Sequence, residues 1–215
     1  MKKYLLEFFG SSLFVFFGTG IGVVSGGDLF LTSLSCGVLY TLERYLFSSV
    51  CNCHLNTAVS ISHAFVHKMS VRDCFYYSLF QILGSITGMF LLFFLLSETN
   101  FGTAELCVNY YGEMSVSGIS CFGAFLVEFL LTTLFVFLFL MMEKKKYFDI
   151  LIGSCLFLLF LFGIPLIGMP SFFARSLAPA IFLGGAAFSE IWVFLLADLS
   201  ASVVASYLFC KISHK

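Results

Sequence analysis

The sequence predicts an all-α membrane protein with six transmembrane helices and two re-entrant half-helices, arranged as an inverted repeat. Three observations predict this fold: the composition, a series of long apolar stretches, and segments that recur in both halves of the chain. Of the 215 residues, 60% are hydrophobic, 11% are charged and 30 are Phe, and the mean hydropathy is +1.03. Soluble domains contain roughly 45 to 50% apolar and about 25% charged residues, so this composition excludes an ordinary soluble domain.

Six stretches are long and apolar enough to cross a bilayer, because a helix needs about 20 residues to span about 30 Å of hydrocarbon. They cover residues 5–25, 29–50, 74–96, 119–142, 148–167 and 188–209. The first is too long for a cleaved signal peptide and has no small-residue cleavage site followed by a soluble domain. We therefore expect it to remain in the mature protein.

The basic residues predict that both termini lie in the cytoplasm, because Lys and Arg are retained in short cytoplasmic loops. They precede the first span, lie between spans two and three and between spans four and five, and follow span six: Lys2, Lys3, Lys68, Arg72, Lys144, Lys145, Lys146, Lys211 and Lys215. Arg44 and Arg175 are the exceptions. We interpret the three lysines from 144 to 146 as a solvated loop, and we expect no nucleic-acid partner.

Two segments resemble each other across the halves of the chain. LLEFFGSSLFVFFG (5–18) aligns without gaps with LVEFLLTTLFVFLF (126–139), and Glu7 aligns with Glu128. Chance similarity between Phe/Leu-rich segments is the alternative, which the matched glutamates disfavour because a carboxylate inside a span is costly. Three spans separate the copies, so the second enters the membrane from the opposite face. We expect one domain, 1–215, with repeats of about 1–97 and 119–215 joined by an outer loop, 98–118.

Two shorter segments occupy equivalent places in these repeats. CHLNTAVSISHAFVHK (53–68) follows the second span, and GMPSFFARSLAPAIFLGG (168–185) follows the fifth. Each has about a dozen helix-compatible residues, which reach about 18 Å, half of a bilayer. Irregular backbone at that depth is tolerated only where it is buried in protein or lines a cavity. The place where the two half-helices meet is therefore expected to be a pore or binding site.

At this point the sequence resembles the aquaporins, the major intrinsic protein family of water and small-solute channels, over nearly its whole length. The resemblance rests on Glu7 and Glu128 and on the segments HLNTAVSI (54–61), YYSLFQILGSITG (76–88) and ARSLAPAIFLGG (174–185). The family's hallmark is a repeated Asn-Pro-Ala at the start of each half-helix. The first copy here is Asn56, Thr57, Ala58, and the second is Phe172, Phe173, Ala174, which lacks both Asn and Pro.

The resemblance implies a role for each matched residue. Asn56 would cap the first half-helix and donate its amide hydrogens to a passing solute; the alternative is an ordinary cap. Arg175 would belong to a selectivity constriction, or else to a structural ion pair. Its partners in the constriction, by ungapped counting that Pro165 supports, are Cys36, Phe160 and Met169. Such a constriction is more apolar than that of strict water channels and only partly resembles that of glycerol channels.

The resemblance also gives Glu7 and Glu128 a scaffold role, as acceptors of hydrogen bonds from the loops that lead to the half-helices; proton relay is the alternative. Phe172 can neither cap a helix nor donate a hydrogen bond, and Ser171 could take over the cap. If Phe172 or Phe173 projects into the lumen, the pore is narrowed and could close by dewetting.

Several polar residues fall outside the family's pattern. They are Glu43, Arg44 and Asp198, of which we expect Arg44 to pair with a neighbouring helix. We expect His54 to contact the cytoplasmic vestibule, and His63 and His67 to lie at the surface or in loops. The eight cysteines lack the spacing of a zinc site, and most of them are interpreted as small hydrophobes. No catalytic triad or metal cluster is indicated, so we expect neither an enzyme nor a cofactor.

The sequence as a whole favours a passive channel for water or small uncharged solutes. The resemblance implies a homotetramer embedded in membrane lipid, with one pore in each subunit. The competing hypothesis is a non-conducting or gated protein of the same fold with a structural or interaction role, which Phe172 and Phe173 motivate. A third option is a channel for another neutral molecule, such as a gas, a peroxide or a polyol.

Overall fold

The computed structural model describes residues 1–101, 107–170 and 172–213. Within these residues, six long helices and two short ones are present, which confirms the expected fold class. The long helices are α1 (Lys2–Val24), α2 (Leu29–Phe47), α4 (Val71–Ser97), α5 (Cys121–Met142), α6 (Phe148–Ile167) and α8 (Gly185–Ser213). The short helices are α3 (Thr57–Phe65) and α7 (Phe173–Leu183), and a single 3-10 turn, η1, covers Gly112–Met114.

Most of the long helices suit a bilayer by length and composition. In the described part of the chain, α1, α4, α5, α6 and α8 are long and apolar enough to cross a membrane. Helix α2 has 19 residues, and it carries Glu43 and Arg44 near its C-terminal end. Together the helices make the protein an integral membrane protein.

The helices pack in the same way in both halves. Helix α1 packs against α4 and α2, and α5 packs against α8 and α6. Helices α2 and α6 join the halves along a third contact. The short helices lie between the long ones: α3 contacts α4, α5 and α8, and α7 contacts α4 and α8.

Glycines allow the long helices to approach closely. A Cβ added at Gly84 or Gly88 of α4 would lie 2.2 Å from the carbonyl oxygen of Phe8 or Ser12 of α1. Small residues four positions apart let two helix backbones come together in this way. A Cβ at Gly37 of α2 would likewise lie 2.6 Å from the carbonyl oxygen of Gly153 of α6. The GSITG segment therefore fixes the contact between α1 and α4.

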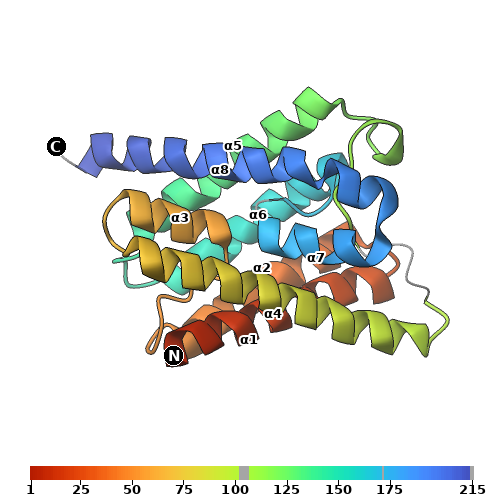
Figure 1. The fold of residues 1–215 in the computed structure, drawn as a ribbon, viewed down its shortest axis with the longest axis horizontal. Coiled ribbons are helices and arrows are strands. Elements are labelled where there is room, and N and C mark those ends of the chain that lie inside the picture. The colour runs from red at the N-terminus through yellow and green to blue at the C-terminus, as the bar shows by residue number, and fades with distance from the viewer. Residues whose placement is uncertain (102–106, 171, 214–215) are drawn as a thin grey trace.

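Figure 1 shows α3 and α7 lying end to end near the middle of the bundle. Helix α3 continues into α4 at the end of the molecule where both chain termini lie, and α7 continues into α8 at the opposite end (Figure 1). The N-termini of the two short helices therefore face each other. Their positive dipole ends meet at the centre of the protein.

Candidate functional site

The first short helix begins with a side-chain cap. Asn56 has an extended backbone, and its Oδ1 accepts hydrogen bonds from the N–H groups of Ala58 at 2.8 Å and Val59 at 3.3 Å. This is the geometry of an N-cap, which satisfies backbone donors that a helix start leaves open. Thr57 follows at the first helical position.

The backbone in front of this cap is held by Glu7 of α1. Its carboxylate accepts hydrogen bonds from the N–H groups of His54 and Leu55 and from Nε2 of Gln81 of α4, each at 2.8 Å. Cys53 and Leu55 have positive φ values of 47° and 52°, a conformation that costs a non-glycine residue free energy. Three charge-assisted hydrogen bonds to one buried carboxylate offset that cost.

The second short helix begins differently. Phe172 occupies its N-cap position without a side-chain hydrogen bond. Instead, Asp198 of α8 accepts a hydrogen bond from the N–H of Phe173 at 2.9 Å and one from the hydroxyl of Thr132 at 2.7 Å. Asp198 also interacts with Glu128 of α5. Ser171, the cap that the sequence suggested, lies outside the described residues.

Asp198 is thus a site residue that sequence reasoning set aside. Its partnership with Glu128 on α5 and α8 parallels that of Gln81 with Glu7 on α4 and α1. A signal was available in the sequence, because a carboxyl group inside an apolar span is rarely without a polar task. The motif comparison missed it because the two equivalent positions hold different residue types.

Phe172 lies inside a cluster of aromatic rings that we call the aromatic plug: Phe14, Tyr40, Phe135, Phe160 and Phe172. The ring of Phe172 stacks on Phe14 with centroids 4.9 Å apart and lies 5.9 Å from Tyr40, 5.7 Å from Phe135 and 6.1 Å from Phe160. These partners come from α1, α2, α5 and α6. Phe172 is 1% exposed, so its ring fills the space between these four helices.

The structure places the four expected constriction residues in the interior. Cys36, Phe160 and Met169 belong to one buried cluster that also contains Phe172. The guanidinium of Arg175 donates to the carbonyl of Cys107 and to Oδ1 of Asn109 at 3.2 Å. Among the described residues Arg175 takes part in no ion pair, and its Nε has no hydrogen-bond partner.

Asn109 was not predicted. Its amide donates to the carbonyl of Met169 at 2.9 Å while its oxygen accepts from Arg175. Asn109 therefore ties the loop in front of α5 to the loop in front of α7. It belongs to no motif, and only the folded chain brings it within reach of Arg175.

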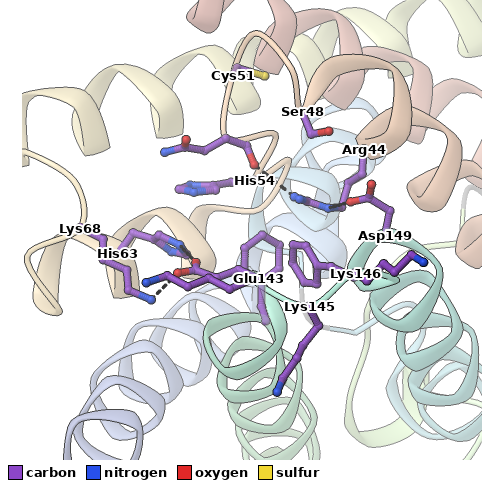
Figure 2. Close-up of a pocket in the computed structure, with 14 residues that line it drawn as sticks. Arg44, Ser48, Cys51, His54, His63, Lys68, Glu143, Lys145, Lys146 and Asp149 are labelled. Carbon is purple, nitrogen blue, oxygen red and sulfur yellow. Dashed lines mark hydrogen bonds and ion pairs between the residues drawn. The ribbon is translucent and has the colours of Figure 1, made fainter. Parts of the chain in front are cut away.

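A cavity of about 580 Å³ opens at the end of the molecule where the termini lie. We call it the basic cavity, defined by its charged and histidine lining: Arg44, His54, His63, Lys68, Glu143, Lys144, Lys145, Lys146 and Asp149. Figure 2 shows Glu143 between His63 and Lys68, and Arg44 beside Asp149. The bond from Nε of Arg44 to Asp149 of α6 is 2.9 Å long, so Arg44 pairs with a neighbouring helix as expected.

His63 corrects a prediction. We expected it at the surface or in a loop, but it is buried in α3, where Nδ1 lies 2.8 Å from the carbonyl of Val59 and Nε2 lies 3.0 Å from Glu143. Burial raises the pKa of Glu143, but the hydrogen bonds from His63 and Lys68 outweigh it and hold that pKa below its usual value. The prediction failed because Glu143, 80 residues away, supplies the partner.

His54 contributes to the wall of the basic cavity, as the sequence suggested, and is itself fully buried. Its ring centroid lies 4.2 Å from that of His63. Nδ1 lies 3.0 Å from the hydroxyl of Ser60, and Nε2 has no hydrogen-bond partner among the described residues. His67 is exposed, as expected. Glu43 is buried, its carboxyl oxygens have no hydrogen-bond partner among the described residues, and nothing in the structure explains it.

A smaller cavity of about 180 Å³ lies on the other side of the aromatic plug and is lined in part by Cys107, Pro165 and Met169. The two cavities share no lining residue. Phe139 lines the basic cavity, and its ring lies 6.4 Å from that of Phe135 in the plug. Within the described residues, no group of three or more His, Cys, Asp and Glu side chains could hold a metal ion.

Comparison with known proteins gives a consistent result. The model of the family described as "Major intrinsic protein" matches residues 1–209. The chain is 30% identical to the glycerol uptake facilitator protein-like 6 of Lactiplantibacillus plantarum over 96% of each chain, and 29% identical to aquaporin Z of Rhodopseudomonas palustris over 99% of this chain and 93% of the other. Its fold is similar to that of the aquaglyceroporin from Plasmodium falciparum, with a TM-score of 0.86, 21% identity and coverage of 98% and 96%.

Proposed function

Because this chain belongs to the major intrinsic protein family, we propose that it is a membrane channel for water or small uncharged solutes whose central passage is narrowed by Phe172. The channel itself follows from the family and from its relatives, which include a glycerol uptake facilitator-like protein and aquaporins. The narrowing distinguishes this protein from a channel with Asn at both helix starts. It is a property of one side chain and can be tested directly.

The position of Phe172 is the observation that supports a narrowed central passage. Its ring lies among four aromatic rings from four helices, between the basic cavity and the smaller cavity. A solute that crosses this region would lose its hydrogen bonds to water and find only ring faces and edges. Apolar constrictions of this kind gate channels by dewetting.

Two features would exclude ions. The N-termini of α3 and α7 each place the positive end of a helix dipole at the centre, and Arg175 adds a full positive charge close to Met169. Protons and cations would be repelled, whereas uncharged solutes would not. We assign Asn56, Arg175 and the carbonyl groups near them as the polar contacts of such a solute.

The constriction formed by Cys36, Phe160, Met169 and Arg175 would select among uncharged solutes. Three of its side chains are apolar or weakly polar, and one donates hydrogen bonds. Glu7 and Glu128 would act as scaffold carboxylates that hold the entries to the half-helices. Asp198 would serve the same purpose for α7, since it binds the N–H of Phe173.

We further propose that the subunit assembles as a homotetramer in which each copy has its own pore, with the inverted repeats 1–97 and 119–215 forming one domain. Both termini would face the cytoplasm. Chemical cross-linking of the purified protein in lipid, followed by mass determination, tests the assembly: a species of four chains supports it, and only single chains would contradict it.

The test of the channel uses purified protein in liposomes that receive an osmotic step with water or glycerol as the permeant. Replacing Phe172 by Ala should raise the rate of volume change several-fold, because it opens the apolar constriction. Phe162→Ala is the matched control, since Phe162 lies on α6 and is 62% exposed. It should leave the rate unchanged.

One other function is favoured by the same observation. If the aromatic plug never opens, the protein has a structural or interaction role in the membrane. Liposomes with the wild type would then change volume no faster than empty ones, whether or not Phe172→Ala raises the rate. The double variant Phe172→Asn with Phe173→Pro is a second probe, because it also removes the ring. A rate raised equally by both variants means that the ring limits passage, a rate raised only by the double variant means that the lost amide does, and a rate raised by neither means that these residues do not limit the pore.

A further inference from the structure

We infer that the basic cavity is a binding site for a phosphate-bearing anion at one mouth of the proposed channel. Occupation of this site would obstruct passage, and that consequence rests on the proposed function. The binding itself does not depend on conduction. Four observations carry the inference: the charge balance of the cavity, the fixed guanidinium in its wall, the contacts of His63, and the start of α6.

The cavity has more positive than negative charge. Five cationic side chains and two carboxylates line it, which leaves three positive charges before histidine is counted. Both carboxylates are already engaged: Glu143 binds His63 and Lys68, and Asp149 binds Arg44. Lys144, Lys145 and Lys146 form no ion pair with a described residue. These three lysines therefore have no acidic partner in the part of the chain that the structure describes.

Arg44 makes this cavity different from an ordinary solvent-exposed basic loop, because its guanidinium is buried and held in place. It is 4% exposed, its Nε donates to Asp149, and its Nη1 donates to the carbonyl groups of Asn52 at 3.1 Å and Cys53 at 2.5 Å. The guanidinium carbon lies 4.8 Å from the ring centroid of Phe139 and 4.3 Å from that of Phe148. A guanidinium held on several sides is preorganised for an oxyanion, and its Nη2 makes no hydrogen bond to a described residue.

His63 engages one of the two carboxylates in the wall of the cavity. Its Nδ1 faces the carbonyl of Val59, and its Nε2 faces the carboxyl group of Glu143, which also accepts from Lys68. Both ring nitrogens thus have partners, which fix the orientation of the imidazole and keep the carboxylate of Glu143 engaged. The imidazole lies deep in the wall, beside the ring of His54.

The N-terminus of α6 opens onto the same space. Phe148 and Asp149, its first two residues, line the cavity, and the preceding Tyr147 provides no side-chain cap. The uncapped N–H groups and the dipole of a helix start attract anions. Here this helix start adds to the basic side chains of the cavity.

Size and chemistry point to phosphate. A cavity of about 580 Å³ holds an anion larger than one phosphate group together with water, since each water takes about 30 Å³. Arg offers a planar fork that matches phosphate oxygens, and lysines act as mobile point charges around it. Free diphosphates and phosphorylated lipid headgroups share this chemistry. Because His54 lies in the wall two residues before the cap residue Asn56, the bound anion would cover the approach to α3.

The first arm of the test uses inorganic pyrophosphate and the protein in nanodiscs of phosphatidylcholine alone, with binding measured by calorimetry. The triple variant Lys144→Gln, Lys145→Gln, Lys146→Gln should weaken binding at least about tenfold, because it removes three positive charges from the rim of the cavity. The control Lys2→Gln, Arg72→Gln, Lys211→Gln removes the same charge from exposed positions outside the cavity. It should retain the affinity.

The second arm uses no free phosphate. Wild type and both triple variants are extracted from vesicles of phosphatidylcholine with a small fraction of phosphatidylinositol bisphosphate, and native mass spectrometry counts the retained lipid. If only the variant of residues 144 to 146 fails to retain the lipid, the site is assigned to a lipid headgroup. If that variant alone loses affinity for pyrophosphate in the first arm, the site is assigned to a free anion. If neither probe binds, or if both triple variants weaken binding equally, the inference is overturned. A protein that binds pyrophosphate but conducts nothing would contradict the proposed function alone.

Discussion

Glu7 is the residue on which the geometry in front of α3 depends. One carboxylate accepts hydrogen bonds from two consecutive backbone N–H groups, of His54 and Leu55, and from the amide of Gln81. All three donors are buried. Glutamine has the same shape as glutamate, but only its carbonyl oxygen can accept a hydrogen bond, because its other terminal group is a donor. At this position the number of acceptor atoms therefore matters more than the side-chain volume.

We expect Glu7→Gln to lower the free energy of unfolding by about 1 to 3 kcal/mol, because at least one buried donor then faces an amide –NH₂ group. Thermal unfolding in detergent, followed by circular dichroism, measures this loss. Glu98→Gln is the control, since Glu98 is exposed at the end of α4. An unchanged midpoint for Glu7→Gln would contradict the scaffold role that we propose.

Single residues differed in how far the sequence could predict them. Glu7 and Asn56 could be placed because each sits in a recognisable pattern, a repeated segment and a helix start. Asp198, Asn109 and His63 could not, because their partners lie in segments far away in the chain. A hydrogen bond between distant segments leaves no periodic signal, so it becomes visible only in the folded protein.

At the scale of elements, the first position of α3, Thr57, can accommodate the proline that the family's Asn-Pro-Ala motif has there. Asn56 has φ −147° and ψ 124°, which is the extended region that a residue before proline requires. The side chain of Asn56 accepts its cap hydrogen bonds from the N–H groups of Ala58 and Val59, and not from the N–H of Thr57. Pro at the first helical position also has its φ already set for the helix.

We therefore expect Thr57→Pro to leave the fold intact and to raise the free energy of unfolding by about 0.4 to 1 kcal/mol, because it restricts the unfolded chain. Ala58→Pro is the contrasting variant. It removes the N–H that donates to Asn56 and should destabilise the protein. Chemical denaturation in detergent compares the two, and equal destabilisation would show that α3 does not begin where the structure places it.

The connection between α3 and α5 should respond to pH. Glu143, just after α5, has a pKa below its usual value because the hydrogen bonds from His63 and Lys68 outweigh burial. A carboxyl group whose pKa is lower in the folded state stabilises the fold above its ordinary pKa of about 4.3. That stabilisation is lost as the pH falls through the lower, folded-state value.

The comparison is between wild type and Glu143→Gln. The unfolding midpoint of the wild type should exceed that of the variant at pH 7, and the difference should shrink as the pH falls below about 4. Glu113→Gln, at an exposed position, controls for the loss of one negative charge. A difference that persists unchanged into acid would mean that the Glu143 contacts contribute nothing through ionisation.

Helix positions were predicted to within a few residues, and the deviations have local causes. Helix α2 ends at Phe47, not at residue 50, because the chain turns there toward α3. Helix α4 begins at Val71, three residues early, where Ser70 accepts a hydrogen bond from the N–H of Asp73. Hydropathy marks the apolar part of a helix, whereas caps and turns decide where it begins and ends.

For the whole molecule, the sequence predicted the number and order of the helices because each long helix needs an apolar stretch and each half-helix needs breakers around it. It could not predict the aromatic plug. Consecutive members of the plug are 12 to 95 positions apart. The motifs singled out Phe160 and Phe172, but nothing in the sequence marks Phe14, Tyr40 and Phe135 as their partners. Their convergence depends on how α1, α2, α5 and α6 pack.

The orientation of the molecule in the membrane is a prediction for the whole chain. Both termini lie at one end of the bundle (Figure 1), and the basic cavity opens at that end with Lys68 and the lysines from 144 to 146 at its rim. Short loops rich in Lys and Arg stay in the cytoplasm. A C-terminal epitope tag should therefore be reached by antibody only after the plasma membrane of intact expressing cells is permeabilised. A tag inserted after Gly118, in the loop at the opposite end, should be reached without permeabilisation, and the reverse pattern would show that the basic cavity faces outward.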